Sequence, residues 1–213
     1  MIILGLVYPR VLGATSDEYI KWIACSLITW QFIASGMMES CSVFTASREL
    51  YLNHKIPFWF FALKNVITNL LVFLHQLPIY IIVAMIFKIN FSMFSFLNLI
   101  IGVLTICIFI FNCSFILGIS CVRFKDIIQI IANLMNIFFL VTPVIWNPKL
   151  LKGAESIINY NPFYYLLESL RAPLLGSFLS SSMWITLLLI MTLLSIFSYW
   201  MYSRYKHCIV YWT

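Results

Sequence analysis

Four stretches of this sequence carry no Asp, Glu, Lys or Arg: residues 65–87, 89–122, 127–148 and 172–203. A lipid core of about 30 Å takes about 20 helical residues to cross, since each residue adds about 1.5 Å to a helix. Each stretch is therefore long enough for a membrane-spanning helix. A fifth stretch, residues 22–47, contains the single charge of Glu39.

The composition supports lipid as the solvent of this chain. Hydrophobic residues make up 63% of the 213 residues and charged residues 9%, whereas soluble domains contain roughly 45–50% and 25%. This excludes a soluble enzyme, a nucleic-acid-binding module and a disulfide-stapled secreted domain. The six cysteines form no C-x-x-C pair and do not indicate a metal site, and the net charge of +6 is spread over many loops.

We therefore predict an all-α integral membrane protein, a polytopic bundle with five full spans near residues 20–47, 62–87, 94–121, 127–146 and 181–203. The apolar segment Met1–Tyr8 is too short to span and is followed directly by Pro9. We expect it to be the end of a first span whose beginning is missing.

The segment before the last predicted span has an unusual composition. Residues 147–180 are too apolar for a solvated loop and too interrupted by Pro and Gly for a spanning helix. We predict two short re-entrant helices, because backbone at membrane depth must satisfy its own hydrogen bonds. Asn161 fits the N-cap of the second, Pro162 its first position, and Gly176 its end.

Lys and Arg in the loops give a weak indication of sidedness. One side carries Arg48, Lys55, Lys64, Arg123, Lys125, Arg204 and Lys206, and the other carries Arg10, Lys21, Lys88, Lys149, Lys152 and Arg171. The excess of one, together with acidic residues that cluster on the second side, favours the first side as cytoplasmic.

Two ionisable side chains fall inside predicted spans. Glu39 should face the bundle interior or a water-filled path, since a charge at that depth costs about 2.5–3.5 kcal/mol on insertion scales. We favour a hydrogen-bonded structural role for it over a proton relay, which one acid cannot form. For His75 we expect a neutral ring that bonds to a neighbouring helix.

The sequence lacks the common motifs of nucleotide-binding proteins, metalloproteases and serine hydrolases. No Gly is followed by Lys, so there is no G-K-[ST] phosphate loop, and the sequence contains no H-E-x-x-H, G-x-S-x-G or G-x-G-x-x-G. The chain is therefore not expected to hydrolyse nucleotide by that route.

Three motifs together resemble one family. They are Val122–Ile130 (VRFKDIIQI), Thr142–Trp146 (TPVIW) and Asn161–Gly176 (NPFYYLLESLRAPLLG), with support from Lys64–Ile67, Phe73–His75 and Ile209–Trp212. In this order and spacing they resemble the ABC-2 type membrane subunits that export lipid-linked polysaccharide, in the O-antigen (lipopolysaccharide) branch. The resemblance covers nearly the whole chain.

The resemblance implies a subunit of a homodimer in the bacterial inner membrane, with two separate ATPase subunits that bind ATP and Mg²⁺. This chain would then be no enzyme, and we expect it to hold no cofactor and to bind no nucleic acid. The segment 47–57 would be the turn that couples to the ATPase, through Arg48, Glu49, Leu50, Tyr51, Leu52, Asn53, His54 and Lys55.

Further positions follow from the same resemblance. Arg123, Lys125 and Asp126 would form the second cytoplasmic turn, for which anchoring to lipid headgroups is an equal alternative. Residues 147–180 would form the exit. Candidates for the substrate path or its gate are Trp30, Glu39, Lys64, Tyr164, Tyr165, Glu168 and Arg171, and Arg48, Lys55 and Lys64 can attract a diphosphate.

Two other functions remain open from sequence. The first is an ABC-2 exporter of capsule, teichoic acid or a small hydrophobic compound. The second is a membrane enzyme that processes glycans, which would need several ionisable side chains converging within the spans. The spans offer only Glu39 and His75, which disfavours the enzyme.

Overall fold

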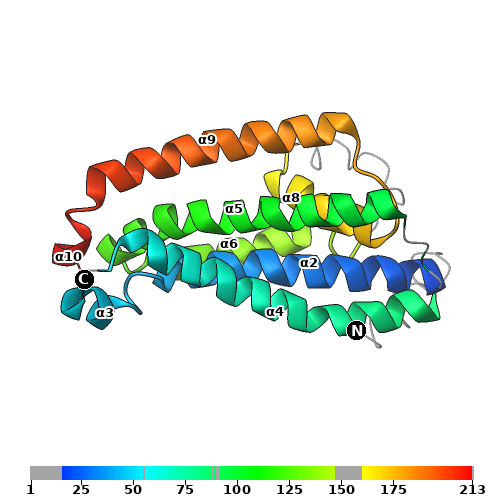
Figure 1. Cartoon of the computed structure of the whole chain (residues 1–213), viewed down its shortest axis with the longest axis horizontal. Coiled ribbons are helices and arrows are strands. Elements are labelled where there is room, and N and C mark those ends of the chain that lie inside the picture. Colours follow the sequence, from blue (N-terminus) through cyan, green and yellow to red (C-terminus); the bar gives the residue numbers. More distant parts are fainter. Residues whose placement is uncertain (1–15, 55, 88, 90–91, 147–159, 213) are drawn as a thin grey trace.

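The computed structural model describes residues 16–54, 56–87, 89, 92–146 and 160–212, and these residues form a helical bundle without strands (Figure 1). Two predicted features lie outside them: the segment Met1–Tyr8, and the first short helix of the exit segment before residue 160. The described helices are α2 (Ser16–Ser42), α3 (Arg48–Asn53), α4 (Phe58–Ile86), α5 (Met93–Arg123), α6 (Ile127–Val141), α8 (Pro162–Leu174), α9 (Ser181–Tyr205) and α10 (Ile209–Trp212).

Helix α5 forms the centre of the bundle and contacts α2, α4, α6, α8, α9 and α10. It is the longest helix, and its start is capped by Ser92, whose hydroxyl accepts a hydrogen bond from the Phe94 N–H at 3.2 Å. The core runs along α2 and α5, and many apolar side chains of α4 and α9 point outward. Outward apolar side chains are expected where lipid is the solvent.

Within the described residues, three helices have both the length and the composition of a membrane span. They are α4, α5 and α9, with mean hydropathies of 1.9, 2.6 and 1.9 over their best windows. Helix α2 has 27 residues, but polar side chains such as Gln31 and Glu39 interrupt its apolar sequence. Helix α6 has 15 residues, or about 22 Å of helix, less than the lipid core. The prediction of a polytopic helical bundle is confirmed, whereas the count of five full spans stays a prediction.

Two helices end earlier than the charge gaps predicted. Helix α2 stops at Ser42 rather than near residue 47, and the Thr45 hydroxyl donates to the Ser42 carbonyl at 3.0 Å in the turn that follows. Helix α6 stops at Val141 rather than at residue 146, because Thr142 precedes Pro143 and adopts an extended conformation. A charge-free stretch shows where the next charged residue lies, but it does not show where the helix ends.

Helix α4 begins earlier than predicted, at Phe58 rather than near residue 62, directly after Pro57. Lys64 therefore lies within its second turn and is exposed. The helix also continues through Pro78. A proline removes one backbone hydrogen bond but does not stop a helix that its neighbours hold in place.

The predicted second helix of the exit segment is confirmed as α8. The Asn161 side chain accepts a hydrogen bond from the Phe163 N–H at 3.0 Å, and Pro162 occupies the first turn. The chain turns after α8 at Gly176, whose φ of 74° is readily adopted by glycine. Helix α8 is mostly buried, packed against α2, α5 and α9.

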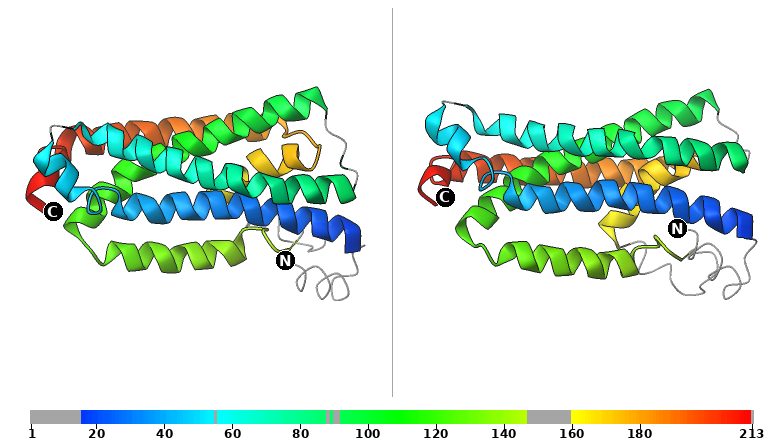
Figure 2. Two further views of the ribbon diagram at one scale, coloured as in Figure 1. Left: turned by 60° about the horizontal axis from the view of Figure 1, so that its bottom comes forward. Right: turned by 90° about the horizontal axis from the view of Figure 1, so that it is seen from below.

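The bundle has two distinct ends (Figure 2). One end carries α3, α10 and the turn between α5 and α6, and we call it the α3 end. The other end carries the end of α4, the start of α5 and the link between α8 and α9. The positive charges of Arg48, Arg123 and Arg204 thus lie at the same end, as the alternation of spans predicts.

Candidate functional site

The candidate site residues fall into four groups, the first of which is the exposed helix α3. None of its residues is buried, and Leu50 and Leu52 are 44% and 51% exposed. Arg48, Glu49, Asn53 and His54 are also exposed, whereas Lys55 lies outside the described residues. A pocket of about 510 Å³ lies beside the helix, between the turn at Thr45 and Ala46 and the α3 side chains.

Tyr51 is the α3 side chain that faces the bundle. Its ring lies 5.4 Å from that of Phe58 and 6.0 Å from that of Phe61, both at the start of α4. Phe44, in the turn after α2, packs against Phe58 at 5.6 Å in an edge-on arrangement. An aromatic cluster therefore packs α3 against the start of α4 and against the turn that follows α2.

The second group is the turn between α5 and α6, at the same end. Arg123, Lys125 and Asp126 are all exposed there. The Arg123 guanidinium lies over two rings, 5.1 Å from the centroid of Phe124 and 5.0 Å from that of Trp212. The chain's last helix is thereby held against this turn.

The third group is a buried ladder of amides and hydroxyls that joins α2, α4 and α5. The Asn65 amide donates to Ser40 Oγ at 3.0 Å and to Ser114 Oγ at 2.9 Å. The Asn69 amide donates to Asn65 Oδ1 at 2.9 Å and to Glu39 Oε2 at 2.8 Å. Glu39 itself is exposed at the edge of the ladder.

The Asn69 amide thus gives Glu39 a hydrogen-bond partner, while the Glu39 side chain is exposed on this chain rather than enclosed. Its structural role stays a prediction. The partners Asn65 and Asn69 were not singled out from sequence. Their spacing of four residues inside a charge-free stretch is the signal that could have found them, because it places both amides on one helix face.

A groove of about 770 Å³ runs along α2 between α4 and α6. Its walls are largely apolar and include Trp30, whose ring packs 5.8 Å from Phe139. The side chains of Gln31, Gln76 and Asn136 also line it. His75, next to Gln76, is exposed on α4 and has no hydrogen-bond partner among the described residues, so the expected bond to a neighbouring helix is not formed within them.

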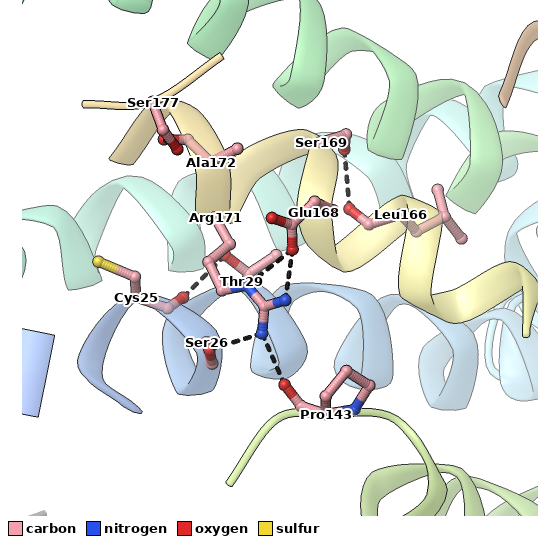
Figure 3. Close-up of polar contacts among 10 residues, drawn as sticks. All are labelled: Cys25, Ser26, Thr29, Pro143, Leu166, Glu168, Ser169, Arg171, Ala172 and Ser177. Carbon is pink, nitrogen blue, oxygen red and sulfur yellow. Dashed lines mark hydrogen bonds and ion pairs between the residues drawn. The ribbon is translucent and has the colours of Figure 1, made fainter. Parts of the chain in front are cut away.

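The fourth group surrounds Arg171 on α8 (Figure 3). Its fully buried guanidinium donates to Glu168 Oε2, to the Pro143 carbonyl at 2.6 Å and to Ser26 Oγ at 3.2 Å. One face of the guanidinium lies over the Trp22 ring, with its central carbon 3.7 Å from the ring centroid. Arg171 thus joins α8 to α2 and to the segment after α6.

The TPVIW and NPFYY motifs lie against each other beside the Arg171 contacts. The Asn161 amide donates to Thr142 Oγ1 at 2.8 Å, and the Tyr19 hydroxyl donates to the Ile145 carbonyl at 2.9 Å. Tyr164 and Tyr165 are half-buried near the start of α8, with ring centroids 5.7 Å apart. In this conformation the Tyr rings and Glu168, whose side chain is 18% exposed, are more accessible than Arg171.

The candidate residues are therefore distributed along the bundle. Helix α3 and the Arg123 turn share one end, whereas the α8 side chains lie nearer the other. Trp30 lines the groove on α2, and Lys64 is exposed on α4. The described candidate residues do not converge on one site.

Comparison with known proteins identifies the family of this chain. Residues 1–175 match the profile of the family described as ABC-2 type transporter. The chain is 21% identical over 175 residues to the "O-antigen export system permease protein RfbA" of Myxococcus xanthus, covering 81% of this chain and 67% of that protein. It is 23% identical over 171 residues to a protein of the same name from Klebsiella pneumoniae, covering 80% of this chain and 66% of that protein. The chain spans about two thirds of the length of these relatives, and with four fifths of its residues matched by the family profile it belongs to the ABC-2 type transporter family.

Proposed function

We propose that this chain is the membrane-spanning subunit of an exporter for lipid-linked polysaccharide of the O-antigen type in the bacterial inner membrane. It works as a homodimer, and a separate ATPase in two copies binds ATP and Mg²⁺ and drives it. Family membership supports the transport role, and the names of the relatives support the substrate at 21–23% identity.

The exposed helix α3 is the observation that carries the proposal of a separate ATPase. It presents Leu50 and Leu52 to solvent at the charged end of the bundle, and a pocket of about 510 Å³ opens beside them. Exposed apolar side chains with a charged rim are typical of a protein–protein contact. Because Tyr51 ties α3 to α4, a motion of the bound ATPase reaches the membrane helices directly.

The substrate path is proposed to run along the polar face of α2. Gln31 and Asn136 are exposed at the groove beside Trp30, and Glu39 is exposed further along the same helix. Amides and carboxylates at membrane depth are costly in lipid, so this face is best placed against a second copy or against the hydrated glycan. Lys64 and Arg48 attract the diphosphate at the α3 end, and Tyr164, Tyr165 and Glu168 meet the glycan at the exit.

The test is complementation in bacteria that lack the permease of their own O-antigen exporter. A full-length gene product with Leu50→Ser and Leu52→Ser should lose surface glycan, since the ATPase contact loses its apolar side chains. Arg48→Ala with Lys55→Ala should do the same, because it removes two basic charges from the segment 47–57. Glycan is measured on cells with antibody and by gel, at matched membrane levels of the protein.

The matched control is Leu188→Ser with Leu189→Ser on α9, where the two leucines are 63% and 56% exposed. This pair has similar exposure but lies on a spanning helix away from α3, and export should persist at matched membrane levels of the protein. Normal export by both α3 variants at unchanged protein level would contradict the coupling role of α3. If the α3 variants lost a different surface polymer and kept O-antigen, that polymer would become the proposed substrate, and the coupling role of α3 would stand.

A further inference from the structure

A second, smaller pocket lies at the α3 end, between the last turn of α5, the first turn of α6 and the end of α9, and we call it the Arg123 pocket. Its volume is about 240 Å³. Ile119, Ile127 and Met201 form an apolar wall, and Arg123, Tyr205 and Trp212 supply its polar and aromatic side chains. It shares no lining residue with the groove along α2.

The guanidinium of Arg123 is held in this pocket by ring contacts. Its central carbon lies 5.1 Å from the ring centroid of Phe124 and 5.0 Å from that of Trp212. Among the described residues it forms no hydrogen bond and no ion pair, although Asp126 is three residues away. Rings that hold the faces of a guanidinium leave its N–H edges free for an acceptor, and the fork of donors matches a phosphate.

The charge around the pocket is positive. Lys125 follows the pocket residue Phe124, and Arg204 and Lys206 flank the pocket residue Tyr205, all three exposed. With Arg123 they make four basic residues against Asp126, so an anion is attracted to this surface.

The aromatic side chains indicate the depth of the pocket in the bilayer. The ring of Tyr205 lies 5.8 Å from that of Trp212 and 6.4 Å from that of Trp200. Clusters of Trp and Tyr at the end of an apolar helix are typical of the membrane–water interface. A ligand of the Arg123 pocket would therefore place a charged group at headgroup level and an apolar part against Ile119, Ile127 and Met201.

We propose that the Arg123 pocket binds the phosphate group of an anionic phospholipid, with the acyl chain along its apolar wall. The pocket is small, offers a single guanidinium and is separate from the groove along α2, which favours a bilayer lipid over the diphosphate of the exported glycan. A free phosphate would leave the apolar wall unused. The bound lipid would hold α10 against the turn between α5 and α6. The proposal rests on membrane insertion and not on the identity of the exported substrate.

The experiment uses the full chain in phosphatidylcholine nanodiscs with graded fractions of phosphatidylglycerol. Retained lipid is counted by native mass spectrometry after release of the protein. The wild type should retain phosphatidylglycerol in preference to phosphatidylcholine with a saturable affinity. Arg123→Gln should weaken that affinity by about tenfold or more, because it removes the charge-assisted hydrogen bonds to the phosphate.

Three further variants separate a site from general attraction. Arg204→Gln removes the same charge from the same end without touching the pocket, and we expect a loss of about threefold or less, since an exposed charge outside contact distance is screened. Arg123→Lys keeps the charge but loses the fork and should lie between wild type and Arg123→Gln. Trp212→Leu removes one ring and should weaken retention although every charge remains. The Lys and Leu variants keep the test decisive if Arg123→Gln does not fold.

Other outcomes would overturn the proposal. Equal losses in Arg123→Gln and Arg204→Gln would show a diffuse electrostatic effect without a site. Undiminished retention by Trp212→Leu and Arg123→Lys together would place the lipid elsewhere. A polyprenyl diphosphate that displaces phosphatidylglycerol from the wild type but not from Arg123→Gln would assign the pocket to the exported substrate, and competition by inorganic phosphate alone would assign it to a soluble anion. Because the assay contains no ATPase and no transport step, a failure to retain phosphatidylglycerol would overturn the lipid site and leave the proposed export standing.

Discussion

Replacing Gly102 with Ala should push α8 away from α5. A Cβ atom at position 102 would lie 2.3 Å from the Ser169 carbonyl oxygen and 3.0 Å from its carbonyl carbon. Both atoms belong to the backbone of α8, so no side-chain rotation relieves the overlap. Ordinary contacts between non-bonded heavy atoms lie near 3.5 Å, and the two helices must therefore separate by about 1 Å.

The size of the effect follows from two opposing terms. Overpacking a well-packed core typically costs about 1–3 kcal/mol, and a backbone clash belongs at the upper part of that range. Alanine in place of glycine inside a helix recovers about 1 kcal/mol. We expect Gly102→Ala to lower the free energy of unfolding by about 1–2 kcal/mol, measured by SDS titration of the purified protein in mixed micelles with circular dichroism as the signal.

Gly36→Ala is the matched control. The nearest atoms to its added Cβ would be Ile110 Cδ1 at 2.4 Å and Cγ1 at 2.5 Å, both in a side chain. A side chain can shift without moving the helix backbone, so the destabilisation should be smaller than that of Gly102→Ala. Wild-type stability for Gly102→Ala, or a larger loss for Gly36→Ala, would refute the close backbone contact between α5 and α8.

Two further predictions concern buried polar groups. Arg171→Gln leaves Glu168 without its ion-pair partner and should destabilise the protein by about 3–5 kcal/mol in the same SDS titration. The double variant with Glu168→Gln should recover part of that loss. Additive losses in the two single variants would contradict the ion pair between Arg171 and Glu168. Asn65→Leu breaks the links to α2 and α5 and should cost about 1–2 kcal/mol. Asn98→Leu should cost less, because among the described residues that amide bonds only to the Phe94 carbonyl of its own helix, at 2.9 Å. An equal cost would argue against the ladder.

The sequence predicted the elements that follow from local chemistry. The cap of α8 at Asn161 and the turn at Gly176 depend on neighbouring residues, and both are confirmed. Stretches with no charge, or with one charge in the case of α2, located the long helices of the described residues but not their ends. The end of α6 depends on Thr142 preceding Pro143, a rule of backbone sterics that charge does not report.

The contacts between distant residues could not be predicted in the same way. Nothing in the local sequence pairs Arg171 with the Pro143 carbonyl or with Ser26, since these contacts join residues 28 and 145 positions apart. The sequence placed Arg171 at the exit as a candidate for glycan contact, and its burial at the junction of three segments appears only in the folded chain. Similarly, Arg123 can stack on Trp212 only because the last residue of α5 and the last residue of α10 meet in the folded chain.

The coupling of α3 to a separate ATPase is tested most directly by site-specific photo-crosslinking. A photoreactive residue is placed at position 50 of the full-length gene product, which is expressed together with the ATPase. A second is placed at Phe178, which is 59% exposed in the link between α8 and α9. We predict a cross-link to the ATPase from position 50 and none from position 178. A cross-link from position 178 without one from position 50 would contradict the proposed docking surface.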